Sequence, residues 1–217
     1  MIGNPINYDK KETVKLINTQ AKIAPELRRY MKLIKGKEVL DLGIGQGQNS
    51  IFLSNFGYQI TGVDFSKKSL ETASENCPNL NLVQDDIRNF NIGKDKYDLI
   101  LSSNVLHFLH KDDSYEIIEN IKSNLKTNGL AYISVFSTDD PSLDFRKNNP
   151  DFCELENNIF HKKSDDTYMS YFSKDEILNL FSDFTTIFIS DEYSLDLGHG
   201  KPHYHGMIKY VGKKGNI

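Results

Sequence analysis

A glycine-rich segment constrains the fold of this chain more than any other feature of its sequence. The segment reads VLDLGIGQGQNS over residues 39–50, and it joins a short apolar run to an amphipathic stretch. Its glycines, Gly43, Gly45 and Gly47, let the backbone turn tightly and approach a ligand closely. A strand that passes through such a turn into a helix is typical of a parallel α/β sheet, in which ligands bind outside the carboxyl ends of the strands.

Short apolar runs alternate with amphipathic stretches along most of the chain, which predicts parallel strands joined by helices. Five strands of this kind are expected, at residues 38–42, 58–63, 80–84, 97–102 and 130–136. Two further strands, 185–193 and 203–211, are joined by the turn-rich segment LGHGKPHYHG and must pair antiparallel, because parallel neighbours need a crossover. We therefore expect an α/β, Rossmann-like fold with a seven-stranded, mostly parallel sheet, an antiparallel last strand and helices on both faces.

The length of 217 residues predicts one domain, 1–217, with two additions. Residues 9–34 show the pattern of two helices, so we expect an N-terminal helical cap over 1–36. Residues 138–166 are polar, contain Pro141 and Pro150 and show no clear period. A segment of this length without regular structure suggests a lid or binding loop, and we expect a substrate-side insertion over 138–172.

The composition narrows the classes of partner. The net charge is −4, whereas a surface that binds nucleic acid usually carries a basic excess. No apolar run reaches the roughly 18 residues of a membrane span, and the first residues lack the apolar core of a signal peptide. Cys77 and Cys153 fit no zinc-binding spacing and favour reduced thiols. We expect a cytoplasmic protein with no membrane or nucleic-acid partner; its oligomeric state is not readable from these features.

Acidic residues after the strands indicate which nucleotide the glycine segment binds. Asp41 stands two residues before the first glycine, where it would repel a pyrophosphate but suits the cationic aminoacyl end of S-adenosylmethionine (SAM). The dinucleotide pattern GxGxxG fails because Gln48 stands at its last glycine. Asp64 ends the second expected strand and can accept hydrogen bonds from both ribose hydroxyls. Asp85 or Asp86, after the third strand, can accept a bond from an adenine amino group.

Four motifs in their order and spacing identify a resemblance to a known superfamily. DLGIGQG, VDFS, QDDI and YDLILSSNVLHFL resemble the class I SAM-dependent methyltransferases, although Ile44 departs from the Cys or Ala of many members. The resemblance implies an enzyme that moves a methyl group from SAM to a small-molecule acceptor with a S, Se, Te, O or N nucleophile, leaving S-adenosylhomocysteine. It implies that Asp41 and Gly43 line the methionine side, that Asp64 holds the ribose, that Phe65 packs on the adenine, and that Asp86 with Ile87 reads the adenine edge. The full candidate set for binding the cofactor is Asp41, Gly43, Gly45, Gly47, Asn49, Asp64, Phe65, Asp86, Ile87, Ser102 and Ser103.

A narrower resemblance concerns the helix after the glycine segment. GQGQNSIFLSNFGYQITGVD, together with STDD after the fifth strand, is similar to the tellurite-resistance and thiol methyltransferase-like branch. This likeness does not determine the substrate. It favours His199 as a functional residue, because that branch carries a histidine near its C-terminal end.

Three histidines lie together near the end of the chain, with the spacing HxxxHxH at His199, His203 and His205. His203 and His205 would share one face, because side chains alternate along a strand. A general base, a metal site and plain turn histidines remain open as interpretations; for a metal we find no nearby carboxylate or cysteine that completes the ligand set. We select His199 and His203, together with His107 after the fourth strand, as candidate catalytic residues, and we assign no metal.

Other functions remain open beside methyl transfer. The fold and cofactor are compatible with a non-catalytic SAM-binding module. Aminopropyl transfer uses a related cofactor, and Asp139, Asp140 and Asp144 would supply carboxylates for a polyamine. A nicotinamide-dependent oxidoreductase is disfavoured by the failed GxGxxG pattern and by the acid at Asp41.

Overall fold

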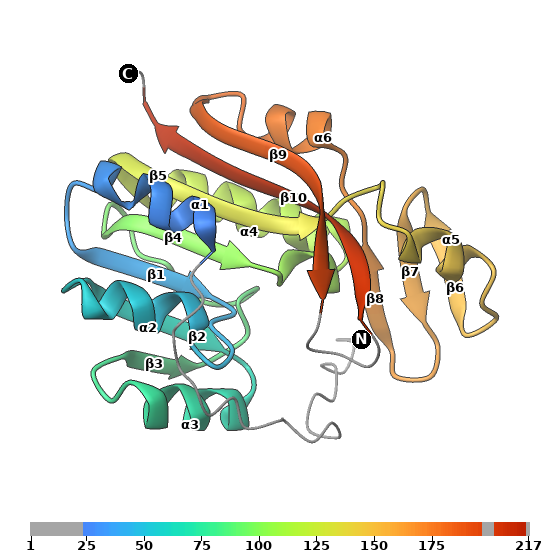
Figure 1. Cartoon of the computed structure of the whole chain (residues 1–217), viewed down its shortest axis with the longest axis horizontal. Helices are drawn as coiled ribbons and strands as arrows, with labels where there is room; N and C mark the ends of the chain where they lie inside the picture. The colour runs from blue at the N-terminus through green and yellow to red at the C-terminus, as the bar shows by residue number, and fades with distance from the viewer. Residues whose placement is uncertain (1–23, 197–201, 216–217) are drawn as a thin grey trace.

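A seven-stranded sheet runs through the centre of the computed structural model, which describes residues 24–196 and 202–215 (Figure 1). The strand order is β3-β2-β1-β4-β5-β10-β9. The first five strands pair in parallel, whereas β10 runs antiparallel to both β5 and β9. This confirms the predicted Rossmann-like sheet with an antiparallel last strand. The strand bounds are β1 Glu38–Leu42, β2 Gln59–Asp64, β3 Asn81–Gln84, β4 Tyr97–Ser103, β5 Leu125–Phe136, β9 Phe184–Asp196 and β10 His203–Lys214.

Helices cover both faces of this sheet, as predicted. Successive strand side chains point to opposite faces, so Leu40 and Leu42 of β1 join one core cluster while Val39 joins the other. The first cluster contains residues of α4 and α6, and the second contains residues of α1, α2 and α3. The helix bounds are α1 Pro25–Tyr30, α2 Gln48–Asn55, α3 Lys67–Asn76, α4 Lys111–Asn124, α5 Ser142–Lys147 and α6 Lys174–Leu180, with 3-10 turns η2 Met31–Leu33 and η3 Leu106–Phe108.

The strand order reverses between β1 and β4, and this reversal determines where a ligand can bind. In open α/β sheets, the crevice at such a point lies outside the carboxyl ends of the strands. The glycine segment leaves the carboxyl end of β1 there. Because β10 is antiparallel, it begins at the same edge: Met207 pairs with Phe136, the last residue of β5. His203 and His205 therefore extend past the end of β5, on the side of the crevice.

The expectation that residues 138–166 lack regular structure was wrong. Residues 138–172 contain α5 and a three-stranded antiparallel sheet of β6 Phe152–Glu156, β7 Ile159–Lys162 and β8 Thr167–Ser170. Most of β6 is exposed, so it carries no alternation of apolar and polar residues that would reveal a strand. In Figure 1 this small sheet lies beyond the carboxyl ends of β4 and β5. It is attached there by a hydrogen bond from Phe172 N to Phe136 O (2.9 Å).

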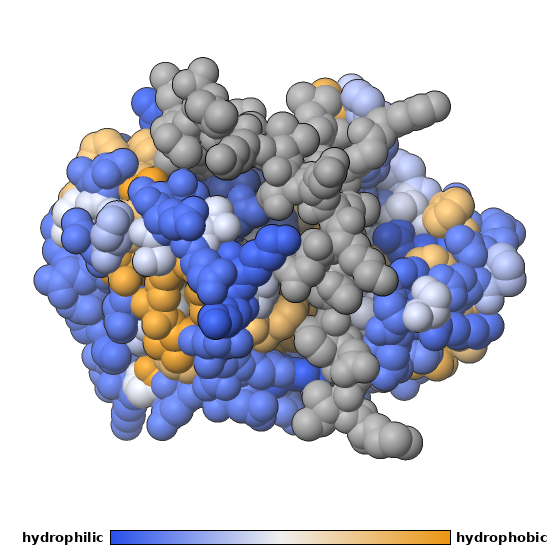
Figure 2. All heavy atoms as spheres, turned by 90° about the horizontal axis from the view of Figure 1, so that it is seen from below, coloured by the Kyte–Doolittle hydropathy of each residue, from blue (hydrophilic) through white to orange (hydrophobic). Residues whose placement is uncertain are grey.

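The N-terminal prediction is described only in part. Of the two helices expected over 9–34, the part from Ala24 onward forms α1 and η2, and the part before Ala24 lies outside the described residues. No helix among the described residues is long and apolar enough to cross a membrane. The face of the molecule in Figure 2 is mostly hydrophilic, with hydrophobic residues at the surface in a band and a few smaller areas.

Candidate active site

The glycine segment forms an open cradle at the carboxyl end of β1. Gly43, Gly45 and Gly47 all adopt positive φ values, of 75°, 54° and 83°. At Gly43 a side chain is also excluded by space, because its Cβ would lie 2.3 Å from Val105 Cγ2. At Gly45, by contrast, a Cβ would meet nothing within 4 Å. The loop is therefore packed against η3 at one glycine and open at the next, as a backbone that a ligand approaches closely must be.

Asp64 lies beside this cradle, at the end of β2. Its Oδ2 accepts a hydrogen bond from Gly45 N (2.8 Å) and its Oδ1 accepts one from Ser66 N (2.9 Å). A carboxylate has about four acceptor positions, so each oxygen can accept a further bond from a hydroxyl. The next residue, Phe65, is 44% exposed and offers an apolar ring beside the carboxylate. The two side chains fit the ribose and the base of a nucleoside.

Asp41 lies deeper, with 3% of its surface exposed. Its Oδ2 accepts a hydrogen bond from Ser50 Oγ (2.6 Å). Burial raises the pKa of Asp41 to about 7, and the nearby charge of Asp64 adds to this, while the bond from Ser50 opposes it. A cation beside Asp41 would favour its charged form, which fits the aminoacyl end of SAM.

Asp86 has a partner that the sequence analysis did not predict. Both of its oxygens accept hydrogen bonds from the Arg88 side chain, with Nε at 3.0 Å and 2.9 Å. Partial burial opposes the charge, but the bonds and the charge of Arg88 outweigh it and lower the pKa of Asp86. Ile87 packs against the core. The Asp86 carboxylate is thus held as an anion by its own loop, and its contact with adenine stays a prediction.

Three further predicted residues have different surroundings. Asn49 Oδ1 accepts a hydrogen bond from Ala24 N (2.9 Å), which ties the start of α1 to the glycine segment. Ser103 Oγ lies 3.3 Å from Ser134 Oγ. Ser102 is buried, and its Oγ has no hydrogen-bond partner among the residues that the structure describes.

The surroundings of His107 do not support its predicted role as a general base. The ring is 1% exposed and stacks on Phe136, with 3.8 Å between ring centroids. Burial above all, with the neighbouring His205 and Arg146, lowers the pKa of His107 to about 3. The ring is neutral at physiological pH and packs like an aromatic core residue.

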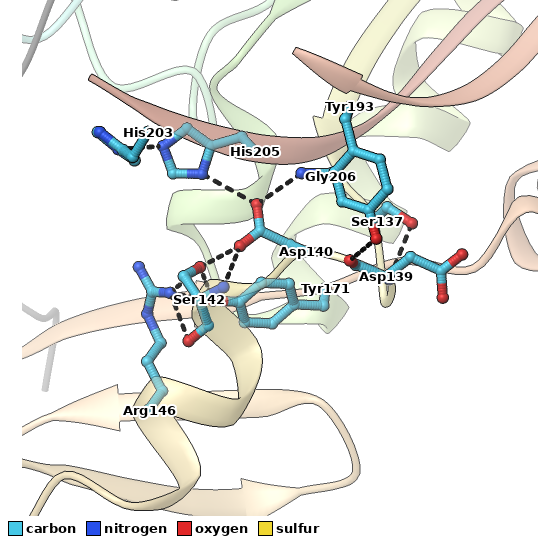
Figure 3. A network of polar contacts seen from close by, with 10 residues as sticks. All are labelled: Ser137, Asp139, Asp140, Ser142, Arg146, Tyr171, Tyr193, His203, His205 and Gly206. Carbon is cyan, nitrogen blue, oxygen red and sulfur yellow. Dashed lines mark hydrogen bonds and ion pairs between the residues drawn. The ribbon is translucent and has the colours of Figure 1, made fainter. Parts of the chain in front are cut away.

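The C-terminal histidines form a closer group than the sequence indicated (Figure 3). His203 Nε2 and His205 Nε2 lie 3.0 Å apart, so the two rings share one face as predicted. The conclusion that no carboxylate lies nearby was wrong, because Asp140 Oδ2 lies 2.9 Å from His205 Nδ1. His199 lies outside the described residues. No group of three or more metal-ligating side chains occurs in the described part of the chain.

The Asp140 carboxylate is the centre of this group. Its side chain is fully buried and contacts His205. It also accepts hydrogen bonds from Gly206 N (3.0 Å) and Ser142 N (2.7 Å). Ser142 Oγ lies 2.9 Å from the Tyr171 hydroxyl, and Arg146 donates to both groups. Figure 3 shows the resulting chain of polar contacts between β10 and the start of α5.

Gly206 explains how Asp140 comes so close to β10. A Cβ at Gly206 would lie 2.7 Å from Asp140 N and 2.8 Å from its Cα, so only glycine admits the turn that carries Asp140. A glycine inside an expected strand was the one sequence signal of this contact, since such glycines often mark a close backbone approach.

Comparison with known proteins is consistent with this site. Residues 39–129 match the family described as a methyltransferase domain. Over 140 residues the chain is 37% identical to the probable S-adenosyl-L-methionine-dependent methyltransferase TehB of Haemophilus influenzae, a match covering 61% of this chain and 48% of that protein. The ubiquinone biosynthesis O-methyltransferase of Rickettsia akari is 30% identical over 112 residues, or 50% of this chain and 43% of that protein. The chain thus spans about half the length of the curated relatives it matches.

Solved structures share the fold. The crystal structure of H. influenzae TehB superposes with a TM-score of 0.70 at 24% identity, over 89% of this chain and 63% of that one. The 1,6-didemethyltoxoflavin-N1-methyltransferase of Burkholderia thailandensis, solved with 1,6-didemethyltoxoflavin and S-adenosylhomocysteine, gives 0.59 at 17% identity, over 86% and 75% of the two chains. The family match therefore places a methyltransferase domain over residues 39–129, which include the glycine cradle, and the chain is similar to TehB in sequence and in fold.

Proposed function

We propose that the protein binds SAM at the glycine cradle and transfers its methyl group to a small-molecule acceptor with a S, Se, Te, O or N nucleophile. The observation that carries the proposal is the position of Asp64, held by Gly45 N and Ser66 N with acceptor positions left for a ribose. Phe65 would pack on the adenine, Asp41 and Gly43 would face the methionine part, and Asp86 with Ile87 would lie at the adenine edge.

When bound, SAM supplies a methyl group on a sulfonium that is already a good leaving group. The chain has to hold the acceptor in line with that methyl group and to exclude water. We assign this task to residues 138–172 on the substrate side and to residues 1–36 as a cap on the cofactor side. The bond from Ala24 N to Asn49 supports the second assignment, because it ties the cap to the glycine segment.

Several observations support a small acceptor. Two of the similar proteins are named for small molecules, namely the 1,6-didemethyltoxoflavin-N1-methyltransferase and the ubiquinone biosynthesis O-methyltransferase. The net charge of −4 argues against a nucleic-acid substrate. Cys77 and Cys153 are both free thiols, which agrees with a protein that works in the reducing cytoplasm.

Titration calorimetry of the full chain with SAM, decarboxylated SAM and NAD tests the proposal. We expect SAM to bind and Asp64→Ala to weaken binding about 10-fold or more, because hydrogen bonds to a charged group are lost. Glu71→Gln is the control, since this exposed acid pairs with Lys67 on the surface of α3. Release of S-adenosylhomocysteine with a panel of acceptors, thiols first, then tests turnover. A folded protein that binds NAD or decarboxylated SAM but not SAM would overturn the proposal.

A further inference from the structure

The Asp140–His205 contact defines which nitrogen of His205 carries a proton. Burial opposes the charge of Asp140, but its hydrogen bonds with His205 and Ser142 outweigh this and lower the pKa of Asp140. An ionised carboxylate can only accept hydrogen bonds, so His205 Nδ1 is the donor in their 2.9 Å contact. In the neutral ring, Nε2 is then the acceptor.

The Nε2 atom of His205 faces a second nitrogen. His203 Nε2 lies 3.0 Å away, and in the neutral pair it donates to His205 Nε2. His203 is exposed, whereas His205 is partly buried. His203 thus occupies the position from which a donor group reaches the acceptor nitrogen of His205, and the attacking group of an acceptor would take its place there.

This position is connected to the glycine cradle by packed side chains. His205 stacks on Phe136 (4.7 Å between centroids), and Phe136 stacks on His107. Two residues before His107, Val105 covers Gly43. A series of side-chain contacts thus links Gly43 to His205 at the carboxyl ends of β1, β4 and β5, the side of the sheet on which SAM and an acceptor would lie.

We propose that His205 is the general base of the methyl transfer and that Asp140 orients it. The inference rests on the proposed function and names the substrate class, an acceptor whose attacking atom still carries its proton at neutral pH, such as a hydroxyl, an amine or an un-ionised thiol. The acceptor's lone pair forms the bond to the methyl carbon, and the electrons of the broken carbon–sulfur bond stay on sulfur. The acceptor's proton passes to His205 Nε2, and the resulting imidazolium is stabilised by the Asp140 carboxylate.

Asp140 and His205 could serve the fold alone, because Asp140 also accepts a hydrogen bond from Gly206 N and so attaches the turn before α5 to β10. The experiment has to separate this structural role from general-base catalysis. Asp98 offers a matched control at the opposite edge of the sheet. It is also a mostly buried acid, and its Oδ2 accepts bonds from Glu38 N (3.1 Å) and Lys126 Nζ (2.9 Å). Among the described residues, the titratable groups that contact or influence His205 are Asp140, His203 and His107, and Arg146 and Tyr171 lie in the same polar network.

The first readout needs no acceptor. The dissociation constants of SAM and of S-adenosylhomocysteine are measured by calorimetry between pH 5.5 and 9. Only SAM carries the sulfonium charge. Protonation of a base beside the methyl group therefore weakens the binding of SAM more than the binding of S-adenosylhomocysteine. We expect the dissociation constant of SAM divided by that of S-adenosylhomocysteine to rise about threefold or more toward low pH. This is the size of effect expected when the sulfonium and an imidazolium lie a few ångströms apart in a partly solvated site. Asp41 acts on both ligands alike, because both carry the same aminoacyl group.

We expect the ratio to be independent of pH in His205→Ala and to change with pH as in the wild type in Asp98→Asn. The second readout is S-adenosylhomocysteine release with 4-nitrothiophenol, ionised at pH 8, and with catechol, which is not. His205→Ala and Asp140→Asn should lose about 100-fold in turnover of catechol and less than threefold with the thiolate. Melting temperatures show whether each variant is folded.

A pH-independent ratio in the wild type, or an equal loss of turnover with both acceptors, would overturn the assignment of His205. If neither acceptor reacts, the binding ratio alone decides. Failure of the proposed function looks different, since SAM would then not bind at any pH, or would bind equally well to Asp64→Ala.

Discussion

The Nδ1 atom of His205 lies 2.9 Å from a carboxylate oxygen of Asp140, although the two residues are 65 positions apart in the chain. The same oxygen accepts the backbone N–H of Gly206. One buried carboxylate therefore both attaches the turn before α5 to β10 and determines the tautomer of a histidine at the edge of the crevice.

Removing this carboxylate should destabilise the fold in a pH-dependent way. In Asp140→Ala, the N–H groups of Gly206 and Ser142 lose a charged acceptor, and we expect a loss of about 3 kcal/mol in the free energy of unfolding at pH 7. The pKa of Asp140 is lowered in the folded state, so this contribution is complete above the unfolded pKa of about 3.9 and is lost as the pH falls through the folded value. Thermal unfolding of both proteins from pH 7 to pH 2.5 measures it. A difference that stays constant over this range would contradict the role of the charge.

Gly206→Ala should move Asp140 away from His205 without removing either side chain. The added Cβ would lie under 3 Å from backbone atoms of Asp140, so the turn has to shift. We expect a loss of about 1–3 kcal/mol in urea unfolding, as for other overpacked sites, together with a weakened contact between His205 and Asp140. A histidine nitrogen NMR spectrum reports the second effect. Unchanged stability and an unchanged His205 tautomer would show that the turn tolerates the side chain.

The glycines of the cradle should respond differently to alanine. In Gly43→Ala the positive φ and the contact with Val105 both oppose a side chain, so we expect an unfolding loss of about 2–4 kcal/mol. In Gly45→Ala only the φ of 54° is unfavourable, and the loss should be near 1 kcal/mol. SAM affinity should nevertheless fall in Gly45→Ala, because its Cβ projects into the open space of the cradle. Urea unfolding and calorimetry on the same samples make the comparison, and full SAM affinity in Gly45→Ala would argue against this binding mode.

His107→Phe should make the protein less sensitive to acid. Because the folded pKa of His107 is lowered to about 3, the unfolded chain binds more protons below its own pKa of about 6.5. Stability is therefore full above pH 6.5 and falls by about 1.4 kcal/mol per pH unit below it, until the folded value is reached. Phenylalanine at position 107 keeps the stacking on Phe136 and cannot bind a proton in the unfolded chain, so this loss of stability at low pH disappears. Denaturation curves at pH 7 and pH 5 test it; a parallel loss in both proteins would contradict it.

The sequence was sufficient where the physical constraint is local. Glycines that must adopt positive φ, acids at strand ends and the short apolar runs of β1 and β5 all appear in consecutive residues, so the sheet and the edge at which its crevice lies could be predicted. The small sheet of β6–β8 could not, because its mostly exposed strand β6 has no apolar face toward a core and so no periodic signal.

The acceptor side was decided by tertiary structure. Whether a histidine can act as a base depends on its burial and its neighbours, and these come from distant segments. Phe136 of β5 covers His107 and shields it from an acceptor, while the turn before α5 brings Asp140 to His205. The sequence alone determined that the chain has a parallel α/β sheet with a glycine-rich turn and an acid at the end of the next strand, because glycines, acids and apolar runs are encoded residue by residue. Only the folded chain selected His205 from the histidines, because a hydrogen bond between residues 65 positions apart depends on how the whole sheet positions its loops.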